Sequence, residues 1–214
     1  MRDRKLDWSY AVTHLYLIRH GANIDGLEDG KYCDLGLSPE GIHQSELLRD
    51  RLKRTGEINP DIFISSPERR AHETATILGP AFGQPIILDK DVEEWRSDDG
   101  SLSPDEFMER WQRIPKGQEA YYRWIEGYEN RLEFSLRVHL TLNRILQEHA
   151  GRTIVLLSHG AFIQLSFGFF FGYGEASLER AAPEIAKTSI SHWRKSQDEN
   201  RWLLERSNDC HHLY

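Results

Sequence analysis

Short apolar runs alternate with amphipathic segments along most of the chain, and this alternation predicts a succession of buried strands and helices. A run that is apolar throughout is typical of a strand covered on both faces, as in a parallel sheet. Four such runs lie at residues 13–18, 61–64, 86–89 and 153–157. A weaker pattern at residues 188–193 and 201–206 predicts edge strands.

Helix punctuation lies between these strands. Ser is a frequent N-cap, Pro is favoured in the first turn, and Gly commonly follows the last helical residue. These signals predict one helix between Ser38 and Gly56 and a second between Ser66 and Gly79. The remaining segments are a helix that ends near Ala150, an apolar helix at 161–171 and an acidic, Gly-rich loop at 21–37.

The order of these elements indicates the fold class. Apolar strands that alternate with helices imply an α/β fold, a three-layer α/β/α arrangement around a mostly parallel central sheet. A length of 214 residues is typical of one domain, so we expect residues 1–214 to form a single domain. Residues 95–133, rich in Trp, Tyr, Arg and Glu, break the rhythm and predict a helical cap insertion outside the sheet.

Charge and composition limit the classes of partner, and the cellular location, that we expect for the protein. The net charge of -7, from 27 basic and 34 acidic residues, argues against nucleic acid or an anionic membrane as a partner. Residues 153–174 lack charged side chains, but Ser158, His159 and several glycines interrupt them, so we expect a strand, a turn and a buried helix rather than a membrane span. An N-terminus without an apolar signal segment and two distant cysteines, Cys33 and Cys210, favour a cytoplasmic protein. The sequence leaves open whether the chain forms a homodimer.

Charged side chains follow the predicted strands at the points where they end. In open α/β sheets, ligands bind beyond the carboxyl ends of the parallel strands. The four strand ends carry, in chain order, Arg19-His20-Gly21, Arg69-Arg70, Glu93-Glu94 and His159-Gly160. We therefore expect these groups to converge on one site.

This set of residue types suits phosphate chemistry. Arg stays charged and pairs with phosphate oxygens in bidentate fashion, and helix N-termini add N–H donors. A neutral imidazole is a competent nucleophile, and a carboxylic acid can protonate a leaving alkoxide. Because Arg19, Arg70 and a protonated His159 balance the charge of a phosphate dianion, we expect no metal and no other cofactor.

Several motifs support this interpretation. They are "LIRHG" at 17–21, "SSPERRA" at 65–71, "VEEW" at 92–95 and "LLSHGAFIQ" at 156–164, with "LGLSPEGIHQS" at 35–45 and "SNDCHHL" at the end of the chain. Together they resemble the histidine phosphatase superfamily, the group that includes cofactor-dependent phosphoglycerate mutase. The resemblance spans Leu15 to Leu213 and implies a phosphoglycerate mutase-like fold.

The resemblance also implies a role for each matching residue. His20 would be the nucleophile that becomes phosphorylated, and Glu94 the general acid and base. The phosphoryl oxygens would be bound by Arg19, by Arg70 rather than Arg69, by His159 and by the backbone N–H of Gly160. Many relatives have Thr or Ser three residues after the nucleophile and Asn six residues after it, where this chain has Asn23 and Gly26. Asn23 is therefore a candidate substrate ligand.

Three functions fit these residues: a phosphatase that acts on a small phosphorylated molecule through phosphohistidine, a phosphoglycerate mutase-type phosphoryl transferase, and a non-catalytic phosphate-binding module. We favour the phosphatase. A binding module has no need of Glu94, and the Arg-His-Tyr-Gly stretch that follows the acid in the mutases is absent here. A metal hydrolase with His20 and His159 as ligands is disfavoured because no His-x-His or Asp-x-His cluster lies near them.

Overall fold

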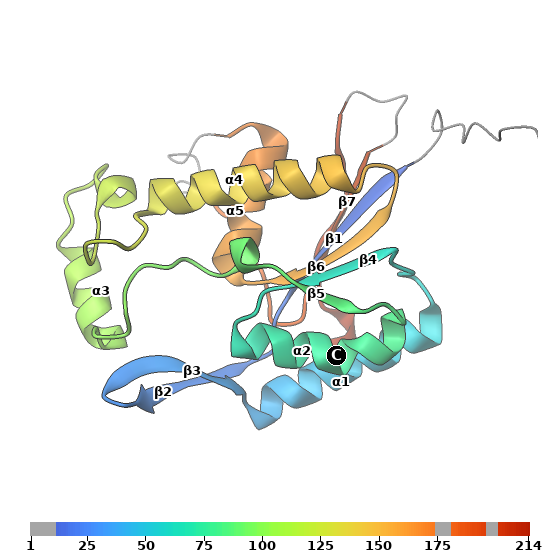
Figure 1. Cartoon of the computed structure of the whole chain (residues 1–214), viewed down its shortest axis with the longest axis horizontal. Helices are drawn as coiled ribbons and strands as arrows, with labels where there is room; N and C mark the ends of the chain where they lie inside the picture. The colour runs from blue at the N-terminus through green and yellow to red at the C-terminus, as the bar shows by residue number, and fades with distance from the viewer. Residues whose placement is uncertain (1–11, 174–180, 196–200) are drawn as a thin grey trace, which may run out of the picture.

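A mixed, mostly parallel sheet forms the centre of the molecule in the computed structural model, which describes residues 12–173, 181–195 and 201–214 (Figure 1). Its six strands are, in spatial order, β5 (Ile86–Leu88), β4 (Ile62–Ser65), β6 (Thr153–Ser158), β1 (Thr13–Arg19), β7 (Ile190–Lys195) and β8 (Leu203–Asp209). The first four strands in this order are parallel to one another, and β7 and β8 are antiparallel to their neighbours. The carboxyl ends of the parallel strands therefore meet at one edge.

Helices cover both faces of the sheet, as the three-layer prediction requires. Helices α1 (Pro39–Thr55) and α2 (Arg69–Phe82) lie on one face, and α4 (Arg131–Glu148) and α5 (Gly160–Phe171) lie on the other (Figure 1). Successive side chains of a strand point to opposite faces. Leu15 and Leu17 of β1 accordingly pack with α4 and α5, whereas Tyr16 and Ile18 pack with α1 and α2.

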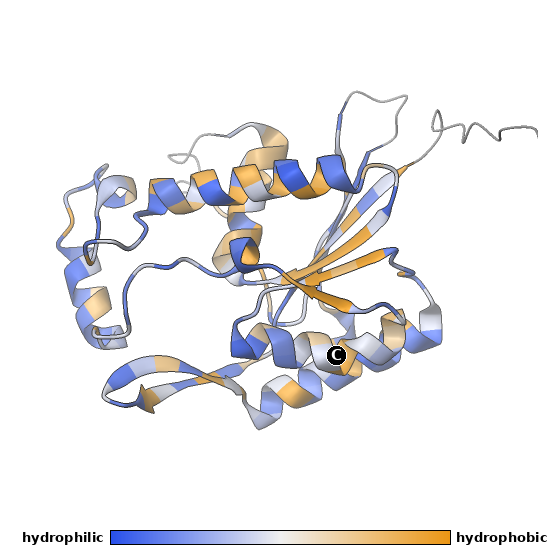
Figure 2. Ribbon diagram, in the orientation of Figure 1, coloured by the Kyte–Doolittle hydropathy of each residue, from blue (hydrophilic) through white to orange (hydrophobic). Residues whose placement is uncertain are grey.

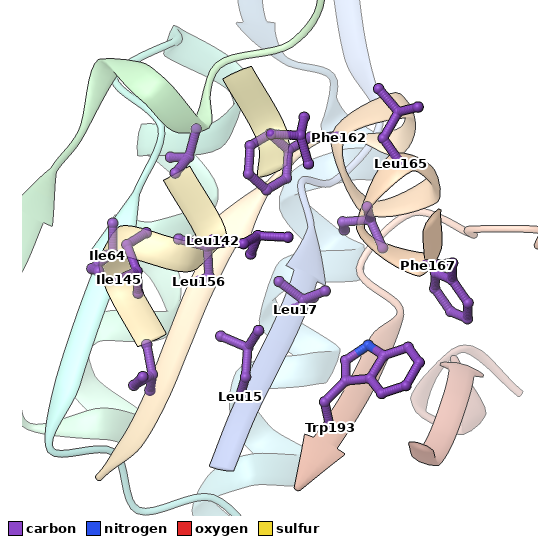
Figure 3. Close-up of a cluster of buried hydrophobic side chains, with 14 of the residues drawn as sticks. Leu15, Leu17, Ile64, Leu142, Ile145, Leu156, Phe162, Leu165, Phe167 and Trp193 are labelled. Atoms are coloured by element: carbon purple, nitrogen blue, oxygen red, sulfur yellow. The ribbon is translucent and has the colours of Figure 1, made fainter. Parts of the chain in front are cut away.

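The apolar residues of the chain concentrate where these layers meet. Figure 2 shows hydrophobic colour along the central strands and alternating colour around the covering helices. In Figure 3, Leu15 and Leu17 lie between Trp193 of β7 and the α4 side chains Leu142 and Ile145. Trp193 is 1% exposed and is the largest fully buried side chain among the described residues. This core fixes the positions of the strand ends, so side chains that follow the strands are held in a defined arrangement.

The predicted loop at 21–37 is wrong, because these residues form a β-hairpin of β2 (Asn23–Glu28) and β3 (Lys31–Leu37). Asp29 and Gly30 both have positive φ, of 52° and 78°, as a type I′ two-residue turn requires. The two strands pair only with each other in the described sheets; β2 is largely exposed, and most of β3 is half-buried. Such strands carry little hydrophobic alternation, so their composition resembles that of a loop.

The boundaries predicted for the second helix are also wrong. Helix α2 begins at Arg69 and continues through Gly79 to Phe82, where Gly83 ends it with φ of 66°. Leu78 and Phe82 are buried, so the apolar face that anchors the helix extends past Gly79. The hydroxyl of Ser66, predicted to cap the helix, instead accepts a hydrogen bond from the backbone N–H of Glu68.

The two C-terminal strands form, but only one lies at an edge. β7 pairs with β1 on one side and β8 on the other, so its predicted edge position is wrong. Its first four residues are buried, because they pack beneath both helical layers as the parallel strands do. β8 is the edge strand, and its register with β7 is interrupted by irregularities.

The segment between β5 and α4 leaves the sheet and contains α3 (Pro104–Gln112) and a short 3₁₀ turn, η3 (Glu119–Tyr121). Its aromatic side chains stack on one another, with the rings of Phe107 and Trp124 only 4.2 Å apart. The segment and the β2–β3 hairpin both lie beyond the carboxyl ends of the parallel strands, at the left of Figure 1.

The uncharged stretch near the C-terminus folds as strand and helix, since β6 and α5 divide it at His159. Across the described ranges, no helix has both the length and the apolar character that a bilayer crossing requires.

Candidate active site

Four elements bring the predicted site residues to the same edge of the sheet. The end of β1 carries Arg19 and His20, the first turn of α2 carries Arg70, and the end of β6 carries His159. Glu94 lies in the segment after β5 and contacts the start of α5. The rings of His20 and His159 have centroids 5.1 Å apart, although 139 positions separate them in the sequence.

His20 is 3% exposed, and its tautomer follows from its partners. Nδ1 lies 2.7 Å from the carbonyl oxygen of Gly21, which only accepts, so Nδ1 carries the proton. Nε2 then accepts from Nε of Arg70 at 3.2 Å. Burial, followed by the neighbouring His159, Lys187 and Arg70, holds the pKa of His20 well below its ordinary value. The ring is therefore neutral near pH 7, with its lone pair directed toward Arg70.

Arg70 is the central cation of the site. Besides His20, its guanidinium contacts Nδ1 of His159 at 3.0 Å, Asp34 at 3.1 Å and Glu68 at 3.0 Å. Its side chain is only 12% exposed. Arg69, in contrast, is 62% exposed and pairs with Glu73 on the outside of the helix. Neighbouring helical residues point about 100° apart, so only one of the two faces the strand ends.

His159 is fully buried between Arg70 and Glu68. Because a guanidinium only donates, Nδ1 of His159 accepts from Arg70, and Nε2 carries the proton. Nε2 lies 2.8 Å from Oε2 of Glu68 and 2.9 Å from the hydroxyl of Ser66. His159 therefore bridges Arg70 and Glu68.

Glu68 links His159, Arg70 and the loop that carries Glu94. Its Oε2 accepts from the backbone N–H of Glu94 at 2.8 Å. Burial raises the pKa of Glu68, but the hydrogen bond from His159 and the charges of His159 and Arg70 outweigh burial and lower the pKa to about 2. Glu68 is therefore an anion at neutral pH, and it holds the nearby donors in place.

The carboxylate of Glu94 lies at the N-terminus of α5. It accepts from the backbone N–H groups of Ala161 at 3.2 Å and Phe162 at 3.3 Å. No side chain within α5 caps this end of the helix, so Glu94 supplies the acceptor that the free N–H groups need. These contacts hold the Glu94 carboxylate at the start of α5, which directly follows the end of β6 and His159.

Arg19 and Gly160 approach each other closely. One Nη of Arg19 donates to the carbonyl of Ile185, and its Nε is buried without a hydrogen-bond partner among the described residues. A Cβ added at Gly160 would lie 3.2 Å from the guanidinium carbon of Arg19, so glycine leaves room for this cation. An unpartnered donor here suits an incoming anion.

Asn23 lies slightly apart from the other predicted ligands. Its side chain donates to Asp25 at 2.9 Å and accepts from Nζ of Lys187 at 3.0 Å. In the described part of the chain, the hydrogen bonds of its amide go to these two residues rather than to His20 or Arg70.

Three residues of the site were missed from the sequence: Asp34, Glu68 and Lys187. Glu68 lies inside the "SSPERRA" motif, and its charge next to the predicted phosphate ligand Arg70 is the sequence feature that indicates a place in the site. Asp34 lies in the segment that the sequence predicts as a loop. Lys187 has no motif around it and reaches the site only because β7 pairs with β1.

Two adjoining cavities open beside Arg70 and Glu94, with volumes of about 460 and 470 Å³. Both are lined by Glu68, Trp95 and Asp98. Further carboxylates line one or the other, namely Asp25, Asp34, Glu93, Glu94 and Glu129. The space that adjoins the phosphate-binding groups is therefore acidic.

Comparison with known proteins shows the family and the fold. The sequence profile of the histidine phosphatase superfamily (branch 1) matches residues 15–210. The chain belongs to this superfamily. Its α/β fold is the phosphoglycerate mutase-like fold of the structural neighbours, as the motifs implied.

Members of the superfamily with different activities resemble the chain. A 5''-phosphoribostamycin phosphatase of Niallia circulans is 29% identical over 212 residues, which cover 93% of this chain and 97% of the relative. A probable phosphoglycerate mutase GpmB of Yersinia pestis is 27% identical and covers 94% of this chain and 95% of its own length. Among solved structures, YhfR of Bacillus stearothermophilus has a TM-score of 0.74 at 22% identity, covering 94% of this chain and 100% of that chain, a likeness of fold.

Proposed function

We propose that this chain is a phosphatase that hydrolyses a small phosphomonoester through a phosphohistidine on His20. The orientation of the His20 ring carries the proposal. Nδ1 is bound to the carbonyl of Gly21, so the lone pair of Nε2 faces Arg70, the residue that we propose as a phosphoryl ligand. A neutral, buried imidazole in this orientation is a prepared nucleophile. The phosphatase-named relatives support this assignment.

The reaction takes two steps. Nε2 of His20 attacks phosphorus, the bond to the ester oxygen breaks, and protonated Glu94 gives its proton to that oxygen. Glu94, now a carboxylate, takes a proton from water, and the resulting hydroxide bonds to phosphorus as the P–N bond breaks. Arg19 and Arg70 stabilise the charge on the phosphoryl oxygens in both steps, together with His159 and the N–H of Gly160.

Water is the proposed phosphoryl acceptor, because the cavities do not suit a phosphoglycerate. Asp98 lines both cavities, where its carboxylate repels a second anionic group on the substrate. Arg96, the cation closest to Glu94 in sequence, is bound to Glu93 at 2.8 Å and to the carbonyl of Lys90. A mutase must hold its phosphorylated intermediate in a site that excludes water. We therefore propose a substrate whose leaving group is neutral or cationic.

We also propose that the chain is one domain in which residues 95–133 form a cap over the substrate. The hairpin supports one side of this cap: Lys31 pairs with Asp99 at 2.7 Å, and the N–H of Tyr32 donates to the carbonyl of Gly100. Cys33 and Cys210 are both free thiols, which fits the cytoplasmic location that we propose.

A screen of phosphomonoesters, with a generic aryl phosphate as positive control, tests this function. We expect turnover by the wild type and none by His20→Ala, with a trapped phosphoenzyme that is acid-labile and alkali-stable. Phosphate binding without any turnover would indicate the non-catalytic module. Incubation with 3-phosphoglycerate and a bisphosphoglycerate primer distinguishes a phosphatase from a mutase. Rapid conversion to 2-phosphoglycerate with little release of free phosphate would identify a mutase.

A further inference from the structure

Lys187 lies in the segment that crosses the carboxyl end of β1, beside the proposed nucleophile. The backbone N–H of Thr188 donates to the carbonyls of Arg19 at 3.1 Å and His20 at 3.4 Å. The N–H of Arg19 in turn donates to the carbonyl of Ser189 at 3.3 Å. Lys187 is thus tied to the backbone that presents His20.

Contacts on both sides hold the backbone of Lys187 in place. The N–H of Ala186 donates to the side chain of Asn208 at 2.6 Å, and the hydroxyl of Thr188 lies 2.8 Å from Nε2 of His212. Thr188 has a φ of 56°, in the left-handed region that a β-branched residue rarely adopts. The surrounding contacts must maintain this unfavourable backbone conformation. Strained residues of this kind cluster at functional sites.

The ammonium group of Lys187 lies among the charges of the site. Nζ donates to Oδ1 of Asn23 at 3.0 Å, and this is the one acceptor that the described residues give it. An ammonium has three N–H donors, so further donors remain for a ligand. The charged groups that act on it come from four elements: Arg19 of β1, Arg70 of α2, Asp25 of β2 and Glu94 after β5.

Two guanidinium groups beside an ammonium repel it unless an anion shares the space. Burial, followed by the charges of Arg19 and Arg70, lowers the pKa of Lys187 to about 8. Arg19 and Arg70 are permanent cations near the end of β1. When a phosphate dianion binds, the ammonium of Lys187 can stabilise its negative charge together with the two guanidinium groups.

We propose that Lys187 is a further phosphate-binding residue, which donates to the phosphoryl group of the substrate together with Arg19 and Arg70. The inference rests on the phosphoryl site proposed above. In the free enzyme, the side chain of Asn23 accepts a hydrogen bond from the ammonium and so positions Lys187 without binding phosphate itself. This contact explains why the side chain of Asn23 faces Lys187 and not His20.

The proposal has a pH signature with a defined sign. A group whose pKa is lowered in the free enzyme loses its proton as the pH rises through about 8. A bound phosphate dianion favours the charged ammonium, so kcat/KM falls above pH 8 as the free enzyme loses this cation. In Lys187→Arg, which stays charged, the decline moves to a higher pH.

The test uses Lys187→Met and Lys187→Arg, with Lys53→Met as the control, because Lys53 is exposed on α1. Binding of inorganic phosphate is measured by calorimetry, and kcat/KM for an aryl phosphate is measured from pH 6 to pH 10. We expect Lys187→Met to weaken phosphate binding at least about tenfold, the loss of one charge-assisted hydrogen bond. Lys187→Arg restores most of the affinity, and Lys53→Met changes nothing.

Two outcomes overturn the proposal: phosphate affinity in Lys187→Met within about twofold of wild type, or no phosphate binding by the wild type at all. Thermal unfolding of each variant shows whether it is folded, and Lys187→Arg decides the question if Lys187→Met is not. A wild type that binds phosphate but turns over no phosphomonoester contradicts the phosphatase and leaves the calorimetric comparison to decide the role of Lys187.

Discussion

Arg137 of α4 supports the loop that carries Glu94, and its removal should affect both stability and catalysis. Its guanidinium makes two hydrogen bonds to the carboxylate of Glu129, at 2.7 and 2.8 Å. The same group donates to the carbonyls of Asp91, Glu93 and Glu94, each at 2.9 Å. The side chain is 10% exposed, so water cannot easily replace these partners.

The loss of folding free energy in Arg137→Met follows from the carboxylate of Glu129, which keeps no guanidinium partner in the variant. The variant removes one partner of a largely buried ion pair, which typically costs about 3–5 kcal/mol. For a chain of this size, a loss of about 3 kcal/mol lowers Tm by roughly 6–12 °C. The freed loop no longer holds Glu94 against α5, and a misplaced general acid should reduce kcat by about 100-fold with little change in KM.

The assay compares an activated aryl phosphate with an alkyl phosphate. A leaving group of low pKa needs little protonation, so a displaced acid affects the alkyl ester more. Arg144→Met on the same helix is the control, since Arg144 pairs with Asp89 but is 41% exposed and should contribute about 1 kcal/mol or less. Equal losses on both substrates, or a Tm within about 2 °C of wild type, would refute the reasoning.

Three further predictions concern the site and the stability of the fold. Arg70→Ala should lower kcat/KM at least about 100-fold, roughly 2.7 kcal/mol of transition-state binding, whereas Arg69→Ala should be nearly silent; the reverse pattern contradicts the placement of these arginines. Treatment with a chelator should leave the rate unchanged, because Arg19 and Arg70 neutralise the phosphoryl group, and restoration of a lost rate by Zn²⁺ or Mg²⁺ contradicts this. Burial, then His14 and Arg206, lower the pKa of His192 to about 4, so its contribution to stability is complete above pH 6.5 and is lost as the pH falls toward 4. At pH 5 the loss is about 2 kcal/mol, and thermal unfolding of His192→Phe should show a weaker pH dependence than wild type between pH 7 and 5.

The site could be outlined from the sequence because its parts follow local patterns. Apolar runs marked the four parallel strands, and the residues directly after them included Arg19, His20 and His159. The boundaries of α2 failed because buried side chains, and not the local Ser and Gly signals, decided where the helix starts and stops. The hairpin at 23–37 is not predicted from the sequence because its strands, one largely exposed and one mostly half-buried, carry little apolar alternation.

The sequence by itself determined the fold class and the residue types available to the site, because hydrophobic periodicity and short motifs are properties of neighbours along the chain. Only the tertiary structure decided which atoms meet. Arg70 and His159 are 89 positions apart, yet an Nη of Arg70 lies 3.0 Å from Nδ1 of His159. Lys187 reaches the end of β1 through the pairing of β7 with β1, and Glu68 meets Glu94 across a gap of 26 positions. Charge states depend on burial and on neighbours in space, and neither is written in a local stretch of sequence.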